Sequence, residues 1–484
     1  MNVVLRSIKK QGEYWIVGVL LFLALLVRVY NLRTPLADWH SFRQADTASV
    51  TREFVRNGID VLHPRYHDLS NIQSGKDNPQ GYRMVEFPIL NAITAMLIRT
   101  FRLQNEEVVV GRMVSISYSL VGLAALYVFV RTLTGRKEAF FATLAASFLP
   151  YSIYYSRVIL PEPAFIANLM VSFAAFALWT KNKRMFWYLI AIGSMTEALL
   201  LKPYGLFLFP VFAAIAWWKW GWRAIKQWEV YLFFVFPVLP LVGWRWWIAK
   251  FSEGIPASDW LYNKDNIRFT GAFFHWIFEV RIANLILGIG MLIPVILSFL
   301  RRGKDVIVYL VWSACLLLYL VVFAGGNVQH DYYQVILIPL LCVLIGRGSS
   351  FILDISKQYS SRILGIGVLA GLFAFSLFVS WYTIRGYYNI NHWEIVHAGI
   401  AADRLLPENA KIIAPYMGDT AFLYQTRRIG WPLGFDIDKK IQMGAQYYIS
   451  TSLDDEARSL IRKYTLIDQT KEYVIIDLQR LRKI

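Results

Sequence analysis

Carboxylates at the ends of apolar segments are the residues of this sequence best suited to acid–base chemistry. Asp38 and Asp46 lie in one polar stretch with Arg43, and Glu162 stands between two prolines in Leu160-Pro161-Glu162-Pro163. A carboxylate can take a proton from an acceptor hydroxyl group. If such an apolar segment crosses a membrane, ionisable groups at its ends are costly to place there and usually functional. These three acidic residues are therefore the first candidates for a catalytic base.

Basic residues also lie at the ends of apolar segments. Arg157 precedes Glu162 by five positions, and Lys202 follows an apolar run in Leu201-Lys202-Pro203. Arg and Lys can hold a phosphate and stabilise the charge that grows on it as it leaves. Plainer interpretations remain open. Asp46 could cap a helix, Glu162 could be a solvated carboxylate or the partner of Arg157, and Lys202 could reach lipid headgroups.

Two further clusters carry groups that can bind ligands. The segment His330-Asp331-Tyr332-Tyr333 follows a glycine pair and offers a His–Asp pair beside two aromatic rings, although such tyrosines are also common at membrane interfaces. His63 and His67 stand four positions apart with Asp68 next to them. On a helix they could bind a divalent metal, but Pro64 favours a plain polar loop.

Composition decides the class of protein. Of 484 residues, 56% are hydrophobic and only 17% are charged, against about 25% charged in a typical soluble domain. This excludes a disordered chain, a soluble nucleic-acid-binding domain and a small secreted scaffold. The two cysteines lie in apolar runs and exclude a disulfide framework. The net charge of +17 is most simply explained by basic loops of a membrane protein.

The apolar runs predict an α-helical, multi-pass protein of the cytoplasmic membrane. A helix needs roughly 20 apolar residues to cross a bilayer, and about eleven runs meet this length. They are 14–32, 108–131, 138–156, 163–181, 186–201, 204–219, 229–249, 282–300, 306–324, 332–348 and 363–383. A shorter run, Val85–Ile98, contains Glu86 and Pro88 and predicts a helix over 84–101 on the outer surface.

Basic residues then set the orientation. With the N-terminus in the cytoplasm, almost all short basic loops face the cytoplasm, as the positive-inside rule requires. The loop 33–107, with a helix from Asp46 to Asn57, and the tail face out. The tail contains strand-like runs at Lys411–Pro415, Tyr447–Thr451 and Tyr473–Leu478. We therefore expect a transmembrane domain over 1–389 and a small extracytoplasmic α/β domain over 390–484.

The order of these motifs resembles a known group. The stretch Arg43-Gln44-Ala45-Asp46, the surface helix with Glu86 and Pro88, Ser156-Arg157 to Glu162, Leu201-Lys202-Pro203 and His330-Asp331-Tyr332-Tyr333 follow one another as in the polytopic glycosyltransferases of the GT-C fold. Bacterial relatives of the protein O-mannosyltransferases and of the lipid A aminoarabinose transferases are the most similar. The resemblance covers roughly residues 14–350.

This resemblance implies a GT-C fold and transfer of a sugar from polyprenyl phosphate to a glycan, lipid or protein acceptor, with inversion. Asp46 and Glu162 then correspond to the catalytic acidic residues. Arg43, Asp38, Glu86 and the segment from His330 to Tyr333 correspond to substrate-binding positions. Many relatives have Lys where this chain has Glu86, which moves the expected phosphate contact to Arg157 and Lys202. The sequence predicts no cofactor, although a pair of carboxylates could bind a divalent cation.

Two other classes of protein fit the apolar runs. A transporter or lipid flippase would place polar groups within its spans, as Glu197 and Arg245 would be. A membrane scaffold whose tail binds a partner leaves the charges at the span ends unexplained. The glycosyltransferase is the expectation that accounts for these charges.

Overall fold

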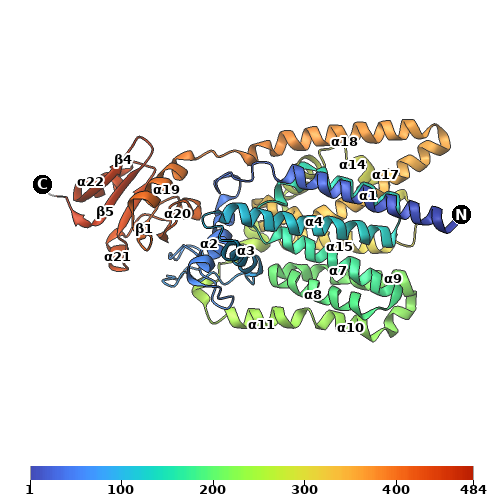
Figure 1. The fold of residues 1–484 in the computed structure, drawn as a ribbon, viewed down its shortest axis with the longest axis horizontal. Coiled ribbons are helices and arrows are strands. Elements are labelled where there is room, and N and C mark those ends of the chain that lie inside the picture. Colours follow the sequence, from blue (N-terminus) through green and yellow to red (C-terminus); the bar gives the residue numbers. More distant parts are fainter. Residues whose placement is uncertain (1, 483–484) are drawn as a thin grey trace. The chain divides into compact units, whose positions relative to one another are not determined.

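The computed structural model describes residues 2–482, which form two compact units (Figure 1). The helical unit comprises Met1–Tyr30, Ser115–Arg245 and Ser258–Arg385. The loop-and-sheet unit comprises Asn31–Val114, Trp246–Ala257 and Gly386–Ile484. Most described residues are helical and the tail forms one small sheet, so the predicted secondary-structure class is confirmed. The predicted domain boundary at residue 390 stays a prediction.

Each apolar run that the sequence predicts as a span contains helix. In Figure 1, α1, α4, α7 and α18 run roughly parallel along the helical unit. The helices that lie wholly or largely in this unit are α1 (Asn2–Arg28), α4 (Glu107–Leu133), α5 (Arg136–Phe148), α6 (Pro150–Tyr155), α7 (Glu162–Asn182), α8 (Met185–Leu201), α9 (Phe209–Trp220), α10 (Trp228–Val235), α11 (Val238–Ile248), α12 (Trp260–Asn263), α13 (Gly271–Phe274), α14 (Leu292–Leu297), α15 (Val306–Val322), α16 (Ala324–Gln329), α17 (Ile338–Tyr359) and α18 (Arg362–Ile384).

The helices have the length and composition of membrane spans. Within the described residues, 5 helical stretches are long and apolar enough to cross a bilayer: Glu107–Leu133, Glu162–Asn182, Trp228–Ile248, Asp331–Tyr359 and Arg362–Leu405. Shorter apolar helices are Ile89–Phe101, Met185–Leu201 and Val306–Val322. The chain is therefore a multi-pass membrane protein, whereas the total of about eleven spans remains a prediction.

The predicted spans 138–156 and 282–300 are each interrupted. The run 138–156 forms α5 and α6, because Pro150 starts a new helix and leaves Leu149 extended. The run 282–300 begins inside a π-helix, His275–Ile286, and breaks at Gly288, whose φ is +53°. A Cβ atom there would lie 2.1 Å from the carbonyl oxygen of Ser376 on α18. Only glycine permits this backbone contact.

A close backbone approach and a hydrogen bond join α5 to α17, and an ion pair joins α5 to Arg301. A Cβ atom at Gly346 would lie 2.4 Å from the carbonyl oxygen of Glu138, so the two backbones approach closely. The Glu138 carboxylate pairs with Arg301 at 2.7 Å and accepts a 2.7 Å hydrogen bond from Ser350. This charge is buried, and its partners offset the cost of its desolvation.

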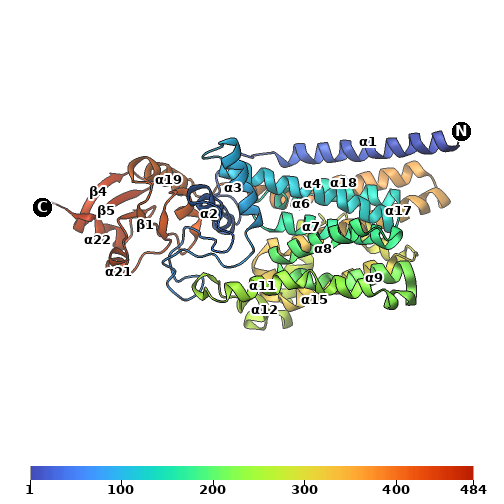
Figure 2. The ribbon, with the colours of Figure 1, turned by 60° about the horizontal axis from the view of Figure 1, so that its bottom comes forward.

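The loop-and-sheet unit combines the first loop with the tail (Figure 2). Its sheet has the order β2-β1-β3-β5-β4, with parallel pairing of β1 to β2 and β3 and antiparallel pairing of β5 to β3 and β4. Its elements are α2 (Ser41–Asn57), α3 (Ile89–Phe101), α19 (Trp393–Leu405), β1 (Lys411–Ile413), α20 (Thr420–Gln425), β2 (Ile429–Trp431), α21 (Ile437–Gln442), β3 (Tyr447–Ser450), α22 (Asp455–Lys463), β4 (Tyr464–Gln469) and β5 (Val474–Leu481).

The sequence predicts three of these strands and misses two. The run Ile429-Gly430-Trp431 of β2 is short, and β4 is an edge strand whose side chains are mostly exposed. Neither gives the apolar signal of a buried strand. The core of the sheet contains Ile413, Trp431 and Tyr448, together with Leu69 from the first loop. The backbone of Leu69 donates a 2.8 Å hydrogen bond to Gly430 on β2.

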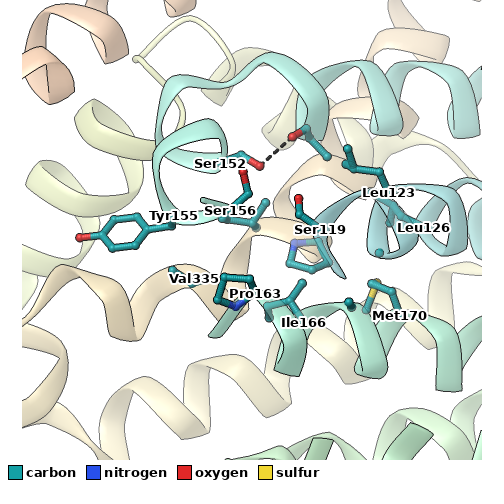
Figure 3. Close-up of a pocket in the computed structure, with 15 residues that line it drawn as sticks. Ser119, Leu123, Leu126, Ser152, Tyr155, Ser156, Pro163, Ile166, Met170 and Val335 are labelled. Carbon is teal, nitrogen blue, oxygen red and sulfur yellow. Dashed lines mark hydrogen bonds between the residues drawn. The ribbon is translucent and has the colours of Figure 1, made fainter. Parts of the chain in front are cut away.

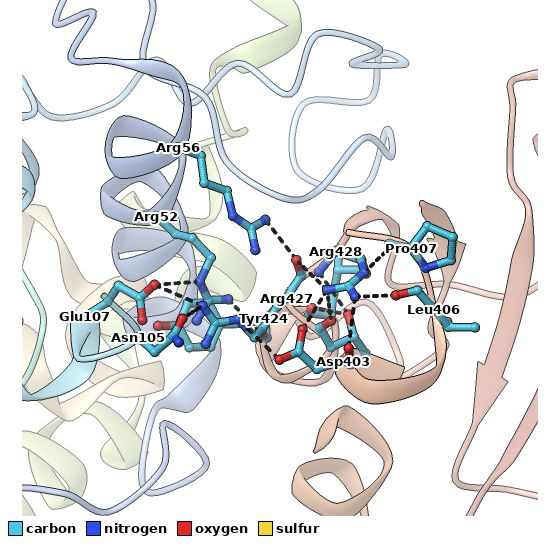
Figure 4. A network of polar contacts seen from close by, with 12 residues as sticks. Arg52, Arg56, Asn105, Glu107, Asp403, Leu406, Pro407, Tyr424, Arg427 and Arg428 are labelled. Carbon is cyan, nitrogen blue, oxygen red and sulfur yellow. Dashed lines mark hydrogen bonds and ion pairs between the residues drawn. The ribbon is translucent and has the colours of Figure 1, made fainter. Parts of the chain in front are cut away.

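Arginines fasten the first loop to the tail within this unit (Figure 4). Arg52 on α2 donates a 2.9 Å hydrogen bond to the carbonyl oxygen of Tyr424, and its guanidinium lies 3.9 Å from the centre of the same ring. Arg428 pairs with Asp403 at 2.9 Å and donates to the carbonyl oxygen of Leu406 at 2.7 Å. The contacts of Arg52 hold α2 against the tail, whereas those of Arg428 lie within the tail.

Candidate functional site

The helix of the first loop begins at Ser41 and ends at Asn57. The predicted start at Asp46 is wrong, because the preceding residues are polar and lack an apolar period, yet they are helical and largely buried. His40 precedes the helix with a φ of 55°. Asp46 therefore lies in the second turn and cannot cap the helix, which removes the plainest interpretation of this residue.

The Asp46 carboxylate is buried and has three partners in the loop-and-sheet unit. Its Oδ2 atom pairs with Arg83 at 3.0 Å and accepts a hydrogen bond from Gln73 at 3.1 Å. Its Oδ1 atom accepts a 2.7 Å hydrogen bond from the hydroxyl of Thr420 at the start of α20. Arg83 also donates to the side chain of Gln73. Residues from two segments far apart in sequence, the first loop and the tail, thus surround one carboxylate.

Two further acidic groups near Asp46 have raised pKa values. Burial raises the pKa of Asp419 to about 6, with the backbone N–H of Ala421 opposing the rise and the charge of Asp46 adding to it. Burial also raises the pKa of Asp68 to about 6, although hydrogen bonds from Ser70 oppose this rise. Perturbed carboxyl groups of this kind gather at functional sites more often than elsewhere.

The other candidates of the first loop form a second group in the same unit. Asp38 accepts a 3.0 Å hydrogen bond from Gln44 and lies 3.6 Å from Arg112. Arg43 pairs with Glu86, which follows Val85 just before α3. The negative charge that replaces the lysine of many relatives is therefore balanced by Arg43. The roles of Asp38, Arg43 and Glu86 toward a substrate stay predictions.

Glu162 is the first residue of α7 and lies in the helical unit. Its side chain is 2% exposed, and Lys202 at the end of α8 approaches it to 2.8 Å. A carboxylate in the first turn of a helix is also favoured by the helix dipole. Glu162 is therefore not a solvated loop carboxylate. Lys202 does not extend to lipid headgroups either, because it is buried beside Glu162.

Arg157 is buried in the turn between α6 and α7. Asp331 is also buried, and it pairs with Arg281 at 3.5 Å and accepts a hydrogen bond from the hydroxyl of Tyr155. Next to Asp331, the rings of His330, Tyr332 and Tyr333 stack on one another. Glu162 and Asp331 are thus each paired with a cation inside the helical unit.

A small cavity adjoins the start of α7 (Figure 3). It measures about 50 Å³ and is lined by Ser119, Ser152, Ser156, Pro163 and Met170, among others. Ligand pockets usually measure about 300–1,000 Å³. The hydroxyl of Ser152 donates a 2.7 Å hydrogen bond to the carbonyl oxygen of Ala146. This cavity is too small to be the binding pocket for a sugar.

The histidine pair of the first loop does not form a metal site. His63 donates a 2.9 Å hydrogen bond to Asp60. His67 is buried with its ring stacked on Tyr424, and its pKa lies well below its usual value because of burial and nearby arginines. Among residues 2–482, no group of three or more His, Cys, Asp or Glu side chains is placed to hold a metal ion.

The sequence gives no signal for the three partners of Asp46. Gln73 and Arg83 lie in a polar loop without any periodic pattern, and Thr420 opens a six-residue helix after Asp419. Asp419 followed by a helix is a recognisable cap, since its side chain accepts from the N–H of Ala421 at 2.7 Å. No local signal links this cap to the first loop.

Comparison with known proteins addresses the fold. No protein-family model matches the chain, and no curated protein matches it either. Among solved structures, ArnT from Cupriavidus metallidurans bound to undecaprenyl phosphate aligns with a TM-score of 0.65 at 14% identity, covering 95% of this chain and 97% of that chain.

Two other solved structures align over most of this chain. The oligosaccharyltransferase from Archaeoglobus fulgidus in complex with Zn and sulfate gives a TM-score of 0.56 at 11% identity, covering 90% of this chain and 68% of that chain. The arabinofuranosyltransferase AftD from Mycobacteria gives 0.57 at 14% identity, covering 96% and 41%. The chain therefore has the GT-C fold, as its motifs predict.

Proposed function

We propose that this chain is a membrane glycosyltransferase that moves a hexose or pentose from a polyprenyl-phosphate donor to an acceptor hydroxyl. The shared fold with ArnT over nearly the whole of both chains is the observation that carries the proposal. That structure of ArnT contains undecaprenyl phosphate, which supports a polyprenyl phosphate as the sugar carrier. The reaction takes place at the outer membrane face and inverts the sugar.

Asp46 is the proposed catalytic base, with Asp38 as the alternative. The hydroxyl of Thr420 lies 2.7 Å from Asp46 Oδ1, which is within the range of roughly 2.6–3.2 Å that proton transfer requires. An acceptor hydroxyl that replaces the Thr420 hydroxyl would meet the same oxygen. The proton passes to Asp46 as the acceptor oxygen attacks the anomeric carbon. The bond from that carbon to the phosphate oxygen breaks in the same step, and its electron pair leaves with the polyprenyl phosphate.

Lys202 and Arg157 are the proposed contacts of the donor phosphate. Both are buried cations at the ends of apolar helices, where a charge-assisted hydrogen bond is stronger than in water. The phosphate leaves as an anion and needs no general acid, so two cations suffice to stabilise it. Glu162 holds Lys202 at 2.8 Å and would orient it toward the phosphate.

A divalent cation does not fit the acidic residues that we assign. Asp46 already contacts Arg83 at 3.0 Å, and a metal ion on the same carboxylate would repel this guanidinium. Glu162 already pairs with Lys202. We therefore derive no step that uses a metal ion. A chelator added to the purified protein should therefore leave the rate of sugar transfer unchanged.

Donor hydrolysis and sugar transfer by the purified full-length protein test the proposed function. We would incubate the protein in detergent with a panel of polyprenyl-phosphate sugars and measure released polyprenyl phosphate and transferred sugar. The Asp46→Asn variant is the matched control. Release by the wild-type protein should exceed release by the variant for at least one donor. Absence of release and transfer above a protein-free blank across the panel would refute the proposal, because neither a transporter nor a scaffold cleaves the donor. Equal activity of the two proteins would refute only the role of Asp46.

A further inference from the structure

Two adjoining cavities in the helical unit are both lined by α5, α17 and α18, and the larger is also lined by α1 and α4. The larger measures about 750 Å³ and has both charged and apolar walls. The smaller measures about 260 Å³ and is lined almost entirely by apolar side chains, including Leu144, Leu369 and Phe373. Phe141 and Ile366 line both cavities. The two cavities are therefore parts of one groove, here called the α18 groove.

The wide end of the α18 groove carries an excess of positive charge. Arg136, Lys137, Lys357 and Arg362 line it, opposed by Glu13 and Asp354. Arg136 pairs with Glu13 at 2.6 Å, and Lys137 pairs with Asp354 at 2.9 Å.

The other two cations supply this excess. Lys357 and Arg362 are exposed, and within residues 2–482 neither of them takes part in an ion pair. The wide end thus presents two cations to an anionic group.

The groove also has the depth of one leaflet of a bilayer. Arg362 lies at its charged end and Phe373 at its apolar end, both on α18. Eleven helical residues span about 16 Å at 1.5 Å per residue. The hydrocarbon core of a bilayer is about 30 Å thick, so one leaflet occupies about half of this. The charged end of the groove matches a lipid headgroup. The smaller apolar cavity, here called the trough, matches one acyl chain.

We propose that the α18 groove binds a glycerophospholipid with an anionic headgroup. The phosphate lies against Lys357 and Arg362, and one acyl chain follows Leu369, Ala370 and Phe373. Basic pockets between membrane helices are known to recognise anionic headgroups. The apolar trough favours a lipid over a soluble anion, because a free phosphate leaves it uncovered. This site is independent of the glycosyl transfer proposed above.

Native mass spectrometry of the full-length protein tests the charged end of the groove. The protein would be titrated with phosphatidylglycerol and with phosphatidylcholine of the same acyl chains, and we expect tighter binding of phosphatidylglycerol. In Lys357→Gln/Arg362→Gln, binding of phosphatidylglycerol should weaken roughly ten- to thirtyfold, since each basic residue near a membrane surface contributes on the order of one kcal/mol. Phosphatidylcholine binding should weaken less, because its choline cation already offsets the charge of its phosphate.

The control removes the same charge elsewhere. Arg302→Gln/Lys304→Gln changes two exposed residues that do not line the groove, and its lipid binding should match the wild-type protein. Equal affinity of the wild-type protein for both lipids would overturn the proposal. An equal loss in the two double variants would overturn it too. Displacement of phosphatidylglycerol by undecaprenyl phosphate would show that the occupant is a polyprenyl lipid instead.

A second pair of variants tests the trough. Ala370→Trp places a large ring among the residues that line it and should weaken binding of both lipids at least tenfold. Val368→Trp lies on an exposed position of the same helix, outside the groove, and should bind as the wild-type protein does. Unchanged binding by Ala370→Trp would overturn the assignment of the acyl chain to this trough.

Discussion

The hydroxyl of Thr420 donates a hydrogen bond of 2.7 Å to the carboxylate of Asp46, although the two residues lie 374 positions apart. Both side chains are buried. The tail of the chain therefore completes the environment of the acidic residue that the first loop supplies. The first loop supplies two partners of Asp46, Gln73 and Arg83, and the tail supplies the third, Thr420. The tail is thus part of the proposed site rather than an appendage.

Asp46→Asn should slow sugar transfer by roughly 100- to 10,000-fold, the usual contribution of a general base. Asn keeps the size of the side chain and one acceptor oxygen but cannot take the proton. The rate is measured by release of polyprenyl phosphate, with donor binding followed separately. Donor affinity should stay near the wild-type value. Transfer at a wild-type rate by Asp46→Asn, together with an inactive Asp38→Asn, would assign the base to Asp38.

A loss of folding must be separated from a loss of the base. Asp46→Asn leaves the buried Arg83 without its carboxylate, and such an unpaired charge typically costs about 3–5 kcal/mol of stability. The double variant Asp46→Asn/Arg83→Gln removes both charges and should recover thermal stability without recovering transfer. Recovery of transfer in the double variant would mean that Asp46 serves only to balance Arg83.

Lys202→Ala should lower both donor affinity and thermal stability. The lost charge-assisted contact to the phosphate is worth roughly 1.5–3 kcal/mol, or about 10- to 150-fold in binding. The stability falls because Glu162 is 2% exposed and loses its partner at 2.8 Å. In Lys202→Ala/Glu162→Gln the melting temperature should recover while donor binding stays weak. Wild-type donor affinity in this double variant would restrict Lys202 to a structural role.

The carboxyl group of Asp68 makes stability depend on pH. Burial raises its pKa from 3.8 to about 6, while hydrogen bonds from Ser70 oppose the rise. A raised pKa favours the folded state below about pH 4, and this contribution is lost as the pH rises through about 6. Asp68→Asn should therefore melt at a higher temperature than the wild-type protein at pH 7.5, by the equivalent of up to about 3 kcal/mol. The gain should shrink toward pH 4.

Asp60 offers a control, because its pKa is shifted in the opposite direction from that of Asp68. Its slight burial raises its pKa, but hydrogen bonds from His63 and from the N–H of Leu62 lower it overall. A lowered pKa stabilises the fold above about pH 4, and this contribution is lost at lower pH. Asp60→Asn should thus melt below the wild-type protein at pH 7.5. A gain in both variants would point to a general effect of removing negative charge.

The sequence predicts those features that follow from local patterns. Long apolar runs specify the helices, and basic residues at their ends suggest an orientation. Glu162 and Lys202 could be singled out because each stands beside a proline at the end of such a run. Their ion pair was not foreseen, since Arg157 is nearer to Glu162 in sequence. Spatial proximity of α7 and α8, not sequence distance, selects Lys202.

Features that depend on distant contacts were not predictable. The first turn of α2 could not be predicted, because Arg43 and Gln44 are polar and yet buried, with Arg43 paired to Glu86. Edge strands such as β4 lack an apolar face of their own. The partners of Asp46 at positions 73, 83 and 420 come from two segments, the first loop and the tail, that carry no common pattern. Tertiary structure alone brings them together.

The orientation of the chain gives the last prediction. Asn182→Cys and Glu408→Cys place single thiols at exposed positions, while the native Cys315 and Cys342 are buried and should react little. Three basic residues at 181, 183 and 184 place Asn182 in the cytoplasm. A membrane-impermeant maleimide should therefore label Glu408→Cys in intact cells and Asn182→Cys only after permeabilisation.

This result also locates Glu162. The helix α7 runs from Glu162 to Asn182 over 21 residues, which corresponds to about 31 Å and matches a hydrocarbon core of about 30 Å. If Asn182 faces the cytoplasm, Glu162 and its partner Lys202 lie at the outer face, where the proposed donor phosphate is bound. Labelling of Asn182→Cys in intact cells would invert α7. It would thereby remove Glu162 and Lys202 from the outer face and refute their proposed role there.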